Sequence, residues 1–284
     1  MPVLPPAMVV TDLDGTLLDA RRVCPEANRE ALEGLGRLGV CRVVATGRSL
    51  HAANHVLTPG FPIDYLVFSA GAGVVRMADR ALLHRASLNA EGVRRAADAL
   101  AALALDYVIL DPVPDSHWFT GFPTPTPHPD YRRRRELYAG FEHPGGCLPE
   151  SACQFIAITA PREGLVEDLR GRLPAHTVVR TTSPLDHSSL WIELFPASVS
   201  KAAAARFVAA GLPQAPTRVL AVGNDFNDLD LLEWATDPVV VGNAPAELRA
   251  RFRTVADHGG AGFAEAVEGF LASVAAKAGG QAGS

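Results

Sequence analysis

The chain has few cysteines, no excess of positive charge and no long apolar run, and each shortage excludes a class of protein. Its four cysteines, Cys24, Cys41, Cys147 and Cys153, form no CxxC pair, so we expect neither a disulfide framework nor a cysteine zinc site. Acidic residues outnumber basic ones by 31 to 26, which leaves no basic field to hold nucleic acid. No run approaches the ~18 apolar residues of a membrane span, and prolines interrupt the N-terminus where a signal peptide would need an apolar segment. We therefore expect a cytoplasmic protein that binds neither nucleic acid nor membrane.

The 284 residues, 48% of them apolar, suffice for about two domains. Strand patterns at 8–10, 40–45 and 65–68 alternate with helix patterns at 25–38 and 50–57, and the alternation resumes with a helix at 201–210, a strand at 218–222 and a helix at 227–234. Such alternation predicts a doubly wound parallel α/β sheet. Between these parts the pattern changes to a separate layer of helices and strands. We predict a discontinuous core, 1–86 and 195–284, an inserted α+β domain, 87–194, and a tail without fixed structure, 276–284.

The segment Asp12-Leu13-Asp14-Gly15-Thr16 follows directly after the first expected strand. Ligands of open α/β sheets bind beyond the carboxyl ends of the strands, and this segment is expected there. Residues i and i+2 of an extended chain point to the same side, so the two carboxylates would lie about 6–7 Å apart. A bound cation would relieve their repulsion and leave one carboxylate for acid–base chemistry. The alternative for this segment alone is a solvated turn.

Three further groups of polar residues end expected strands or begin expected helices. Thr46 and Gly47 end the second strand with a hydroxyl and backbone N–H groups, which suits an anion. Lys201, one of only two lysines among 26 basic residues, begins a helix where a compact ammonium can meet a phosphoryl oxygen. Oxygen ligands crowd the segment Gly223-Asn224-Asp225-Phe226-Asn227-Asp228, a composition that suits Mg²⁺. Each group alone could be a helix cap or a surface charge, but together they predict one site for phosphate and Mg²⁺.

In this order the motifs DxDGT, TGR, SK and GNDxND resemble those of the haloacid dehalogenase superfamily of phosphohydrolases. More narrowly, the chain resembles the Cof-type sugar-phosphatase branch, which carries a large α/β cap between the second and third motifs. The segment Trp191-Ile192-Glu193-Leu194 before Ser200-Lys201 is similar to that branch's exit from the cap, and the likeness covers nearly the whole chain. It implies a Mg²⁺-dependent phosphohydrolase for small phosphorylated metabolites, above all sugar phosphates, with a cap that closes over the site.

The resemblance also implies a role for each motif residue. Asp12 is the nucleophile that forms an aspartyl-phosphate, and Asp14 protonates the leaving oxygen and then activates water. Phosphoryl transfer needs positioning and charge cancellation, and a covalent intermediate divides it into two easier steps. The implied phosphate-binding residues are Thr46, Gly47, Lys201 and Asn227, and the implied Mg²⁺ ligands are Asp12, Asp14, Asn224, Asp225 and Asp228.

Two positions depart from the family's pattern. Asn224 stands where the family has an aspartate; its amide oxygen can bind Mg²⁺ but carries no charge, which the adjacent Asp225 could supply. Ala70 stands where the family often has asparagine, so one polar contact is lost. Asn224 motivates one alternative, a catalytically weak ligand-binding or regulatory protein. A phosphosugar mutase of the same architecture is another.

Other features are interpreted as structural. The GxGxxG pattern at 34–39 lies at the end of an expected helix and before a strand, the reverse of the dinucleotide-binding order. The run Arg132–Arg135 is interpreted as a solvated face rather than a substrate-binding cluster, and at least one of Trp118 and Phe119 as core packing. The chain indicates a small phosphorylated substrate, but its patterns specify neither which metabolite nor an oligomeric state.

Overall fold

The computed structural model describes residues 5–183, 185–186 and 188–281, and the chain divides into two compact units. The first unit consists of the chain up to Gly47, of Asn54–Leu83, and of the chain from Lys201 onward. The second unit consists of Arg48–Ala53 and His84–Ser200. These divisions fall a few residues from the expected boundaries at 86 and 195, and the grouping of Arg48–Ala53 with the second unit was not expected. No helix in the described part of the chain is long and apolar enough to cross a membrane.

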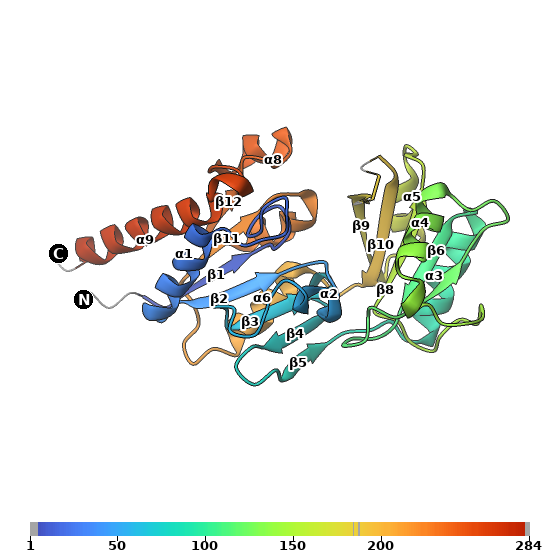
Figure 1. Ribbon diagram of the computed structural model, residues 1–284, viewed down its shortest axis with the longest axis horizontal. Helices are drawn as coiled ribbons and strands as arrows, with labels where there is room; N and C mark the ends of the chain where they lie inside the picture. Colours follow the sequence, from blue (N-terminus) through green and yellow to red (C-terminus); the bar gives the residue numbers. More distant parts are fainter. Residues whose placement is uncertain (1–4, 184, 187, 282–284) are drawn as a thin grey trace. The chain divides into compact units, whose positions relative to one another are not determined.

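The first unit is built on an eight-stranded sheet with the order β13-β12-β11-β1-β2-β3-β4-β5 (Figure 1). Strands β13 to β3 in this order are parallel, and β3 and β4 are antiparallel. Thr11 at the end of β1 lies opposite Val222 on one side and Val44 on the other, so the loops that follow β1, β2 and β11 leave the sheet at the same edge. The strands are β1 (Ala7–Thr11), β2 (Cys41–Ala45), β3 (Tyr65–Phe68), β4 (Gly73–Arg76), β5 (Leu82–Arg85), β11 (Arg218–Gly223), β12 (Asp237–Val240) and β13 (Arg253–Thr254).

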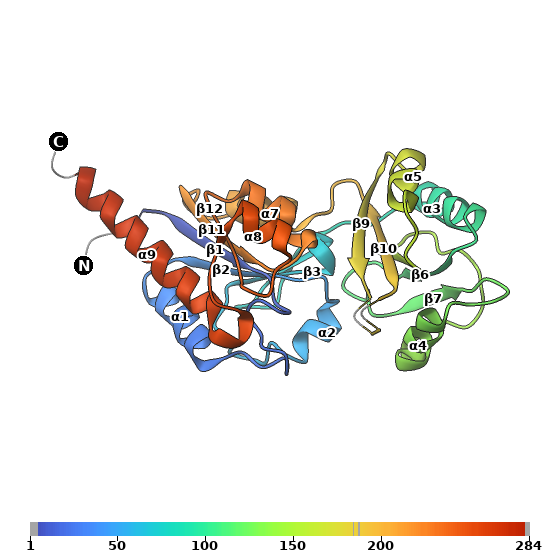
Figure 2. The ribbon, with the colours of Figure 1, turned by 90° about the horizontal axis from the view of Figure 1, so that it is seen from above.

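Helices cover both faces of this sheet, which confirms the doubly wound α/β fold. All five residues of β1 are buried, as expected for a strand with neighbours on both sides and helices on both faces. Helices α1 and α9 pack together, and α6 and α7 pack together on the other face (Figure 2). The helices are α1 (Glu26–Arg37), α6 (Lys201–Ala210), α7 (Leu229–Trp234), α8 (Ala246–Arg251) and α9 (Gly262–Gln281), with short turns η1 (Ser69–Gly71), η3 (Phe226–Asp228) and η4 (His258–Gly260).

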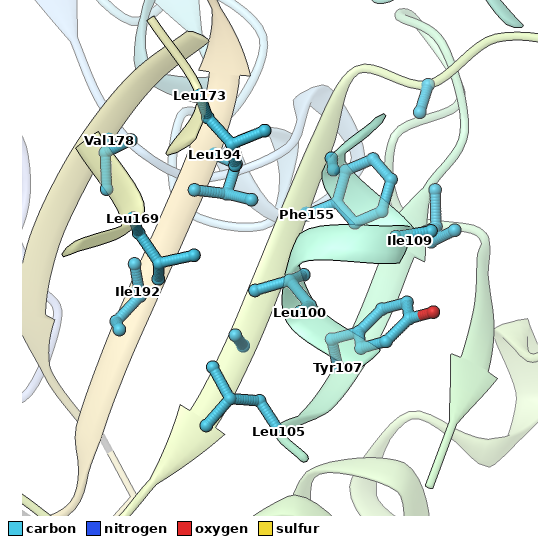
Figure 3. Packing of buried hydrophobic residues seen from close by; sticks show 14 of the residues in the cluster. Leu100, Leu105, Tyr107, Ile109, Phe155, Leu169, Leu173, Val178, Ile192 and Leu194 are labelled. Carbon is cyan, nitrogen blue, oxygen red and sulfur yellow. The ribbon is translucent and has the colours of Figure 1, made fainter. Parts of the chain in front are cut away.

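The second unit is an antiparallel five-stranded sheet with the order β7-β6-β8-β10-β9. Its larger core lies between the sheet and helices α3 and α5, where Leu100, Phe155 and Ile192 are essentially inaccessible to solvent (Figure 3). Helix α4 packs on the opposite face, with Tyr131 in a second core cluster. The elements are α2 (Leu50–Asn54), α3 (Ala90–Ala102), β6 (Asp106–Leu110), β7 (Phe119–Phe122), α4 (Pro129–Leu137), η2 (Ala139–Phe141), β8 (Gln154–Thr159), α5 (Leu165–Arg172), β9 (His176–Thr182) and β10 (Leu190–Pro196).

Some expectations from the sequence are wrong. The hairpin β4–β5, the strand β7 inside the proline-rich stretch, and β12 and β13 were not expected, and α2 ends at Asn54 rather than at residue 57. Residues 276–281, expected to lack structure, belong to α9, while 282–284 lie outside the described residues. In the run Arg132–Arg135, the interpretation as a solvated face fails at Arg134, which is only 6% exposed and lies over the ring of Phe119. Phe119 is fully buried, so one of the two aromatics expected to pack does so.

Candidate active site

The residues of the first motif occupy the loop that follows β1. The backbone N–H of Asp12 still bonds to the carbonyl of Val222 in the neighbouring strand β11, at 2.9 Å, so the sheet itself fixes its position. The chain then turns at Gly15, whose φ of +71° belongs to the left-handed region that favours glycine. Asp12 is buried and Asp14 is exposed. The two carboxylates therefore stand in different environments, one desolvated and one open to water.

Lys201 joins two carboxylates from distant parts of the chain. Its Nζ lies 2.6 Å from Oδ1 of Asp12 and 2.6 Å from Oδ1 of Asp228. The Lys201 side chain is 2% exposed, and those of Asp12 and Asp228 are 7% and 0% exposed. Lys201 is the first residue of α6. Asp12 lies in the loop after β1, and Asp228 lies in the segment after β11. The arrangement brings the first, third and fourth motifs to one point, as expected from the parallel strand order.

Burial and charge act on these groups in opposite directions. Burial raises the pKa of the Asp12 carboxyl to about 7, with a further increase from Asp228, although Lys201 opposes both effects. Burial would by itself lower the pKa of the Lys201 ammonium, but the two carboxylates outweigh it and raise that pKa. The site thus holds one buried cation against two buried carboxylates, and a further positive charge would stabilise it.

The loop after β11 is shaped around Asp228. Its Oδ2 accepts hydrogen bonds from the backbone N–H groups of Asn224 at 2.9 Å and Asp225 at 3.3 Å. A Cβ at Gly223 would lie 2.7 Å from the Asp228 carboxylate, so only glycine allows this close approach. The Asn224 amide oxygen accepts from the Thr16 hydroxyl at 3.2 Å, so Asn224 faces the first motif. Asp225 instead uses its Oδ1 to accept from the N–H of Phe226, at 2.7 Å.

The remaining predicted residues lie around the same sheet edge. Thr46 is buried directly after β2, and its N–H bonds to Val67 in β3 at 2.9 Å. Gly47 after it is exposed. The Oδ1 atom of Asn227 is buried and has no hydrogen-bond partner, which leaves an acceptor available to a ligand, to a metal or to water. The sequence predicts an anion-binding helix N-terminus directly after Thr46 and Gly47. The helix that follows is shorter and begins later than expected, because α2 has only five residues and begins at Leu50.

The departure at Ala70 has a backbone counterpart. Ala70 has φ of 54° and ψ of 19°, and its N–H bonds to the carbonyl of Thr46 at 3.0 Å. Asparagine and glycine tolerate this left-handed conformation better than alanine does. An asparagine at this position would therefore favour the observed backbone conformation, in addition to making any polar contact.

Two residues of the site were missed in the sequence. Asn243 donates from Nδ2 to the carbonyl of Gly15 at 2.9 Å, and its Oδ1 accepts from the N–H of His258 at 3.1 Å. Thr16 belongs to the first motif, but the sequence alone assigns it no role. The sequence contains a signal for Asn243: Gly242-Asn243 follows the apolar run 239–241 just as Gly223-Asn224 follows the apolar run 219–222.

The donor set suits a hard divalent cation such as Mg²⁺, which prefers oxygen ligands. The described residues contain no group of three His, Cys, Asp or Glu side chains arranged to hold a metal, so amide and backbone oxygens would have to complete its coordination. Asn224 offers such an oxygen beside the first motif. Burial disfavours the ionised form of Asp12, and a nearby cation would reverse that preference. The residues present therefore fit Mg²⁺.

A comparison with known protein families identifies the family of the chain. The chain belongs to the haloacid dehalogenase-like hydrolases, whose family model matches residues 9–262. This match confirms the resemblance drawn from the motifs. No curated protein matches the chain.

Solved structures share the fold over most of the chain. A phosphatase of the haloalkanoate enzyme superfamily from Bacteroides thetaiotaomicron superposes with a TM-score of 0.76 at 19% identity, over 94% of this chain and 95% of that one. A haloacid dehalogenase-like hydrolase from B. subtilis gives 0.71 at 19% identity, over 92% and 98%. A subclass IIB sugar phosphatase gives 0.73 at 16% identity, over 93% and 98%. These likenesses establish the fold, and the activity has to be argued from the site.

Proposed function

We propose that the protein is a Mg²⁺-dependent phosphatase of the Cof-type branch that hydrolyses small phosphorylated metabolites, sugar phosphates in particular. The observation that carries the proposal is the ammonium of Lys201 held 2.6 Å from both Asp12 and Asp228. A buried lysine between two carboxylates is a charge arrangement ready to receive a phosphoryl group and a cation. The sugar-phosphatase structure among the similar folds supports the substrate class.

In the proposed reaction, an Asp12 carboxylate oxygen attacks phosphorus. The bond from phosphorus to the ester oxygen breaks, and Asp14 gives that oxygen a proton, so the alcohol leaves. Asp14 then takes a proton from water as the water attacks the aspartyl-phosphate, which releases inorganic phosphate and restores Asp12. The exposure of Asp14 suits this exchange with water, whereas buried Asp12 is shielded from it.

Charge cancellation would come from three sources. Lys201 and Thr46 would bind the phosphoryl oxygens, with Gly47 and Asn227 beside them. Asp12, the carbonyl of Asp14, Asn224 and Asp228 would hold Mg²⁺, and Asp225 would add negative charge from its capping position. When bound, Mg²⁺ would neutralise the negative charge that otherwise repels a carboxylate nucleophile from a phosphate ester.

Release of inorganic phosphate from an aryl phosphate, with and without Mg²⁺, tests this function. We expect turnover only with the metal, and its loss in Asp12→Asn. Asp79→Asn is the matched control, because Asp79 is an exposed aspartate paired with Arg76 on a hairpin away from the motifs. Absent or metal-independent turnover on a broad panel of phosphate esters would favour a ligand-binding protein instead.

Product analysis on a hexose phosphate separates hydrolysis from the mutase alternative. Free phosphate and free hexose support the phosphatase. An isomerised hexose phosphate without free phosphate would instead indicate that the protein is a mutase.

A further inference from the structure

A pocket lies at the edge of the eight-stranded sheet opposite the candidate active site. It is lined by Ala7, Cys41 and Tyr65, where β1, β2 and β3 begin, and by Arg76, where β4 ends (Figure 1). All of its lining residues belong to the first unit. Its volume of about 1240 Å³ exceeds the roughly 300–1,000 Å³ of typical small-molecule sites, so a small molecule has room there.

Most of the side chains around the pocket are apolar. Leu57 and Ile63 are buried among them, whereas Leu38 and Met77 are partly exposed. Their surface can remove a hydrocarbon group from water. Aliphatic side chains outnumber the aromatic ones in the lining, so the wall suits a flexible chain better than a flat ring.

Hydrogen bonds fix one side of the pocket. The Arg42 guanidinium donates to both carboxylate oxygens of Asp64, at 3.0 and 2.7 Å, and the Arg42 backbone N–H donates to Oδ2 at 2.8 Å. The N–H of Met77 bonds to the Asp64 carbonyl at 2.9 Å. The GxGxxG segment at 34–39, which lacks the dinucleotide-binding context, contributes to the same lining. A wall held in this way loses little conformational freedom when a ligand binds.

The pocket contains one arginine whose charge no carboxylate neutralises. The other two lining arginines, Arg42 and Arg76, each form an ion pair with an aspartate. Arg80 instead donates to the amide oxygen of Asn54 and to the sulfur of Met77, and it has no acidic partner among the described residues. Since Asn54 and Met77 also line the pocket, these contacts hold the guanidinium at its wall.

Two further titratable groups of the pocket are uncharged near pH 7. Burial raises the pKa of the Cys41 thiol to about 12, with a further increase from Asp64. Burial also raises the pKa of the Tyr65 phenol. The two ion pairs are neutral as units, so Arg80 gives the pocket a net positive charge beside its apolar surface.

We propose that this pocket binds a small aliphatic carboxylate, with the hydrocarbon chain on the apolar wall and the carboxylate on the guanidinium of Arg80. Charge complementarity selects an anion over a neutral or cationic molecule. A guanidinium can donate two parallel hydrogen bonds to a carboxylate. The site takes no part in the proposed phosphatase reaction, and its occupation does not depend on that function.

Methionine-methyl NMR tests the proposal with octanoate as the probe. The chain has three methionines. Met77 lines the pocket, while Met8 is completely buried in the core of the same sheet. Titration of protein labelled with [methyl-13C]methionine should shift the Met77 signal in a saturable way and leave Met8 almost unchanged, with Met77→Leu to assign the signal. No saturable shift at Met77 with up to 10 mM octanoate overturns the proposal.

A neutral analogue and a charge variant test the role of Arg80. Octanoate should bind the wild type about three- to tenfold more tightly than 1-octanol, as for a charge-assisted hydrogen bond weakened by solvent. Arg80→Gln should remove this difference, whereas Arg133→Gln, at an exposed arginine of the second unit, should preserve it. Equal binding of the two probes to the wild type, or a difference that survives in Arg80→Gln, overturns carboxylate recognition.

Two further outcomes identify a different occupant. A Met77 signal that moves with protein concentration in the absence of octanoate, together with a dimeric mass in light scattering, assigns the pocket to a second copy of the chain. Octanoate binding that appears only after residues 1–4 are removed assigns it to the N-terminal segment. Either result overturns the proposal, and neither bears on the phosphatase.

Discussion

Removal of the Lys201 ammonium should destabilise the protein strongly and in a pH-dependent way. In Lys201→Met the carboxylates of Asp12 and Asp228 stay buried without their shared cation. Each 2.6 Å contact corresponds to about 6 kcal/mol of Coulomb energy at an effective dielectric constant of ~20, and most of that is offset by desolvation of the ammonium. Breaking a buried pair by removing one partner leaves a net loss of about 3–5 kcal/mol, or about 6–20 °C in melting temperature for a chain of this size.

The pH dependence follows from Asp12. Its pKa is already raised by burial, and without Lys201 it should rise further, so the folded state holds a proton that the unfolded state has released. Stability then falls as pH increases from the unfolded pKa near 3.8 towards the folded value. The loss in Lys201→Met should therefore be larger at pH 8 than at pH 6.

Thermal unfolding in the presence of EDTA, at pH 6 and pH 8, measures both effects. Asp228→Asn should restore much of the stability of Lys201→Met, because the double variant again buries a single negative charge. A melting temperature of Lys201→Met equal to that of the wild type at pH 8 would refute this reasoning. A double variant no more stable than the single one would refute it as well.

Three other changes have defined outcomes. Ala70→Gly should raise the free energy of unfolding by about 0.5–1 kcal/mol, because relief of the left-handed strain exceeds the added entropy of the unfolded chain; a destabilised variant in urea unfolding would contradict this. Asn224→Asp should tighten Mg²⁺ binding about tenfold in isothermal titration calorimetry, and unchanged affinity would exclude Asn224 as a ligand. Burial lowers the pKa of His176, so below pH 6.5 the unfolded state binds more protons and stability falls as pH falls. His176→Phe should flatten the melting temperature between pH 5 and pH 6.5, and an unchanged slope would assign that dependence to other groups.

The strand ends were predictable because apolar runs and the polar residues after them are adjacent in sequence. The run Met8-Val9-Val10 followed by Asp12, and 218–222 followed by Asn224, predict both a buried strand and the edge at which it ends. The convergence of Lys201 on Asp12 and Asp228 followed from parallel strand order and from the rarity of lysine. The strand ends and the meeting point of the motifs could therefore be predicted from local sequence pattern and from the rule that ligands bind at the carboxyl ends of parallel strands.

The features that were missed depend on contacts between distant segments. β7 lies within a stretch rich in proline, and tertiary pairing with β6 makes it a strand against its composition. The sequence predicts that Arg134 is exposed like the other three arginines of its run. In the structure it lies on the face of α4 that packs on the sheet, where it is buried over the ring of Phe119. The orientation of Asn224 towards Thr16 and of Asp225 towards its own turn also lay beyond the sequence, since both residue types serve equally as ligand or cap.

The strand order has a consequence for how the protein is made. β1 pairs with β2, which ends at Ala45, and with β11, which begins at Arg218. A ribosome must therefore polymerise more than 200 residues before the strand that precedes Asp12 acquires its second neighbour, and until then one edge of that apolar strand is open to other chains. A nascent chain in this interval has Asp12 but lacks Asp228, and for most of the interval it also lacks Lys201, so the interval combines an open strand edge with an incomplete candidate site.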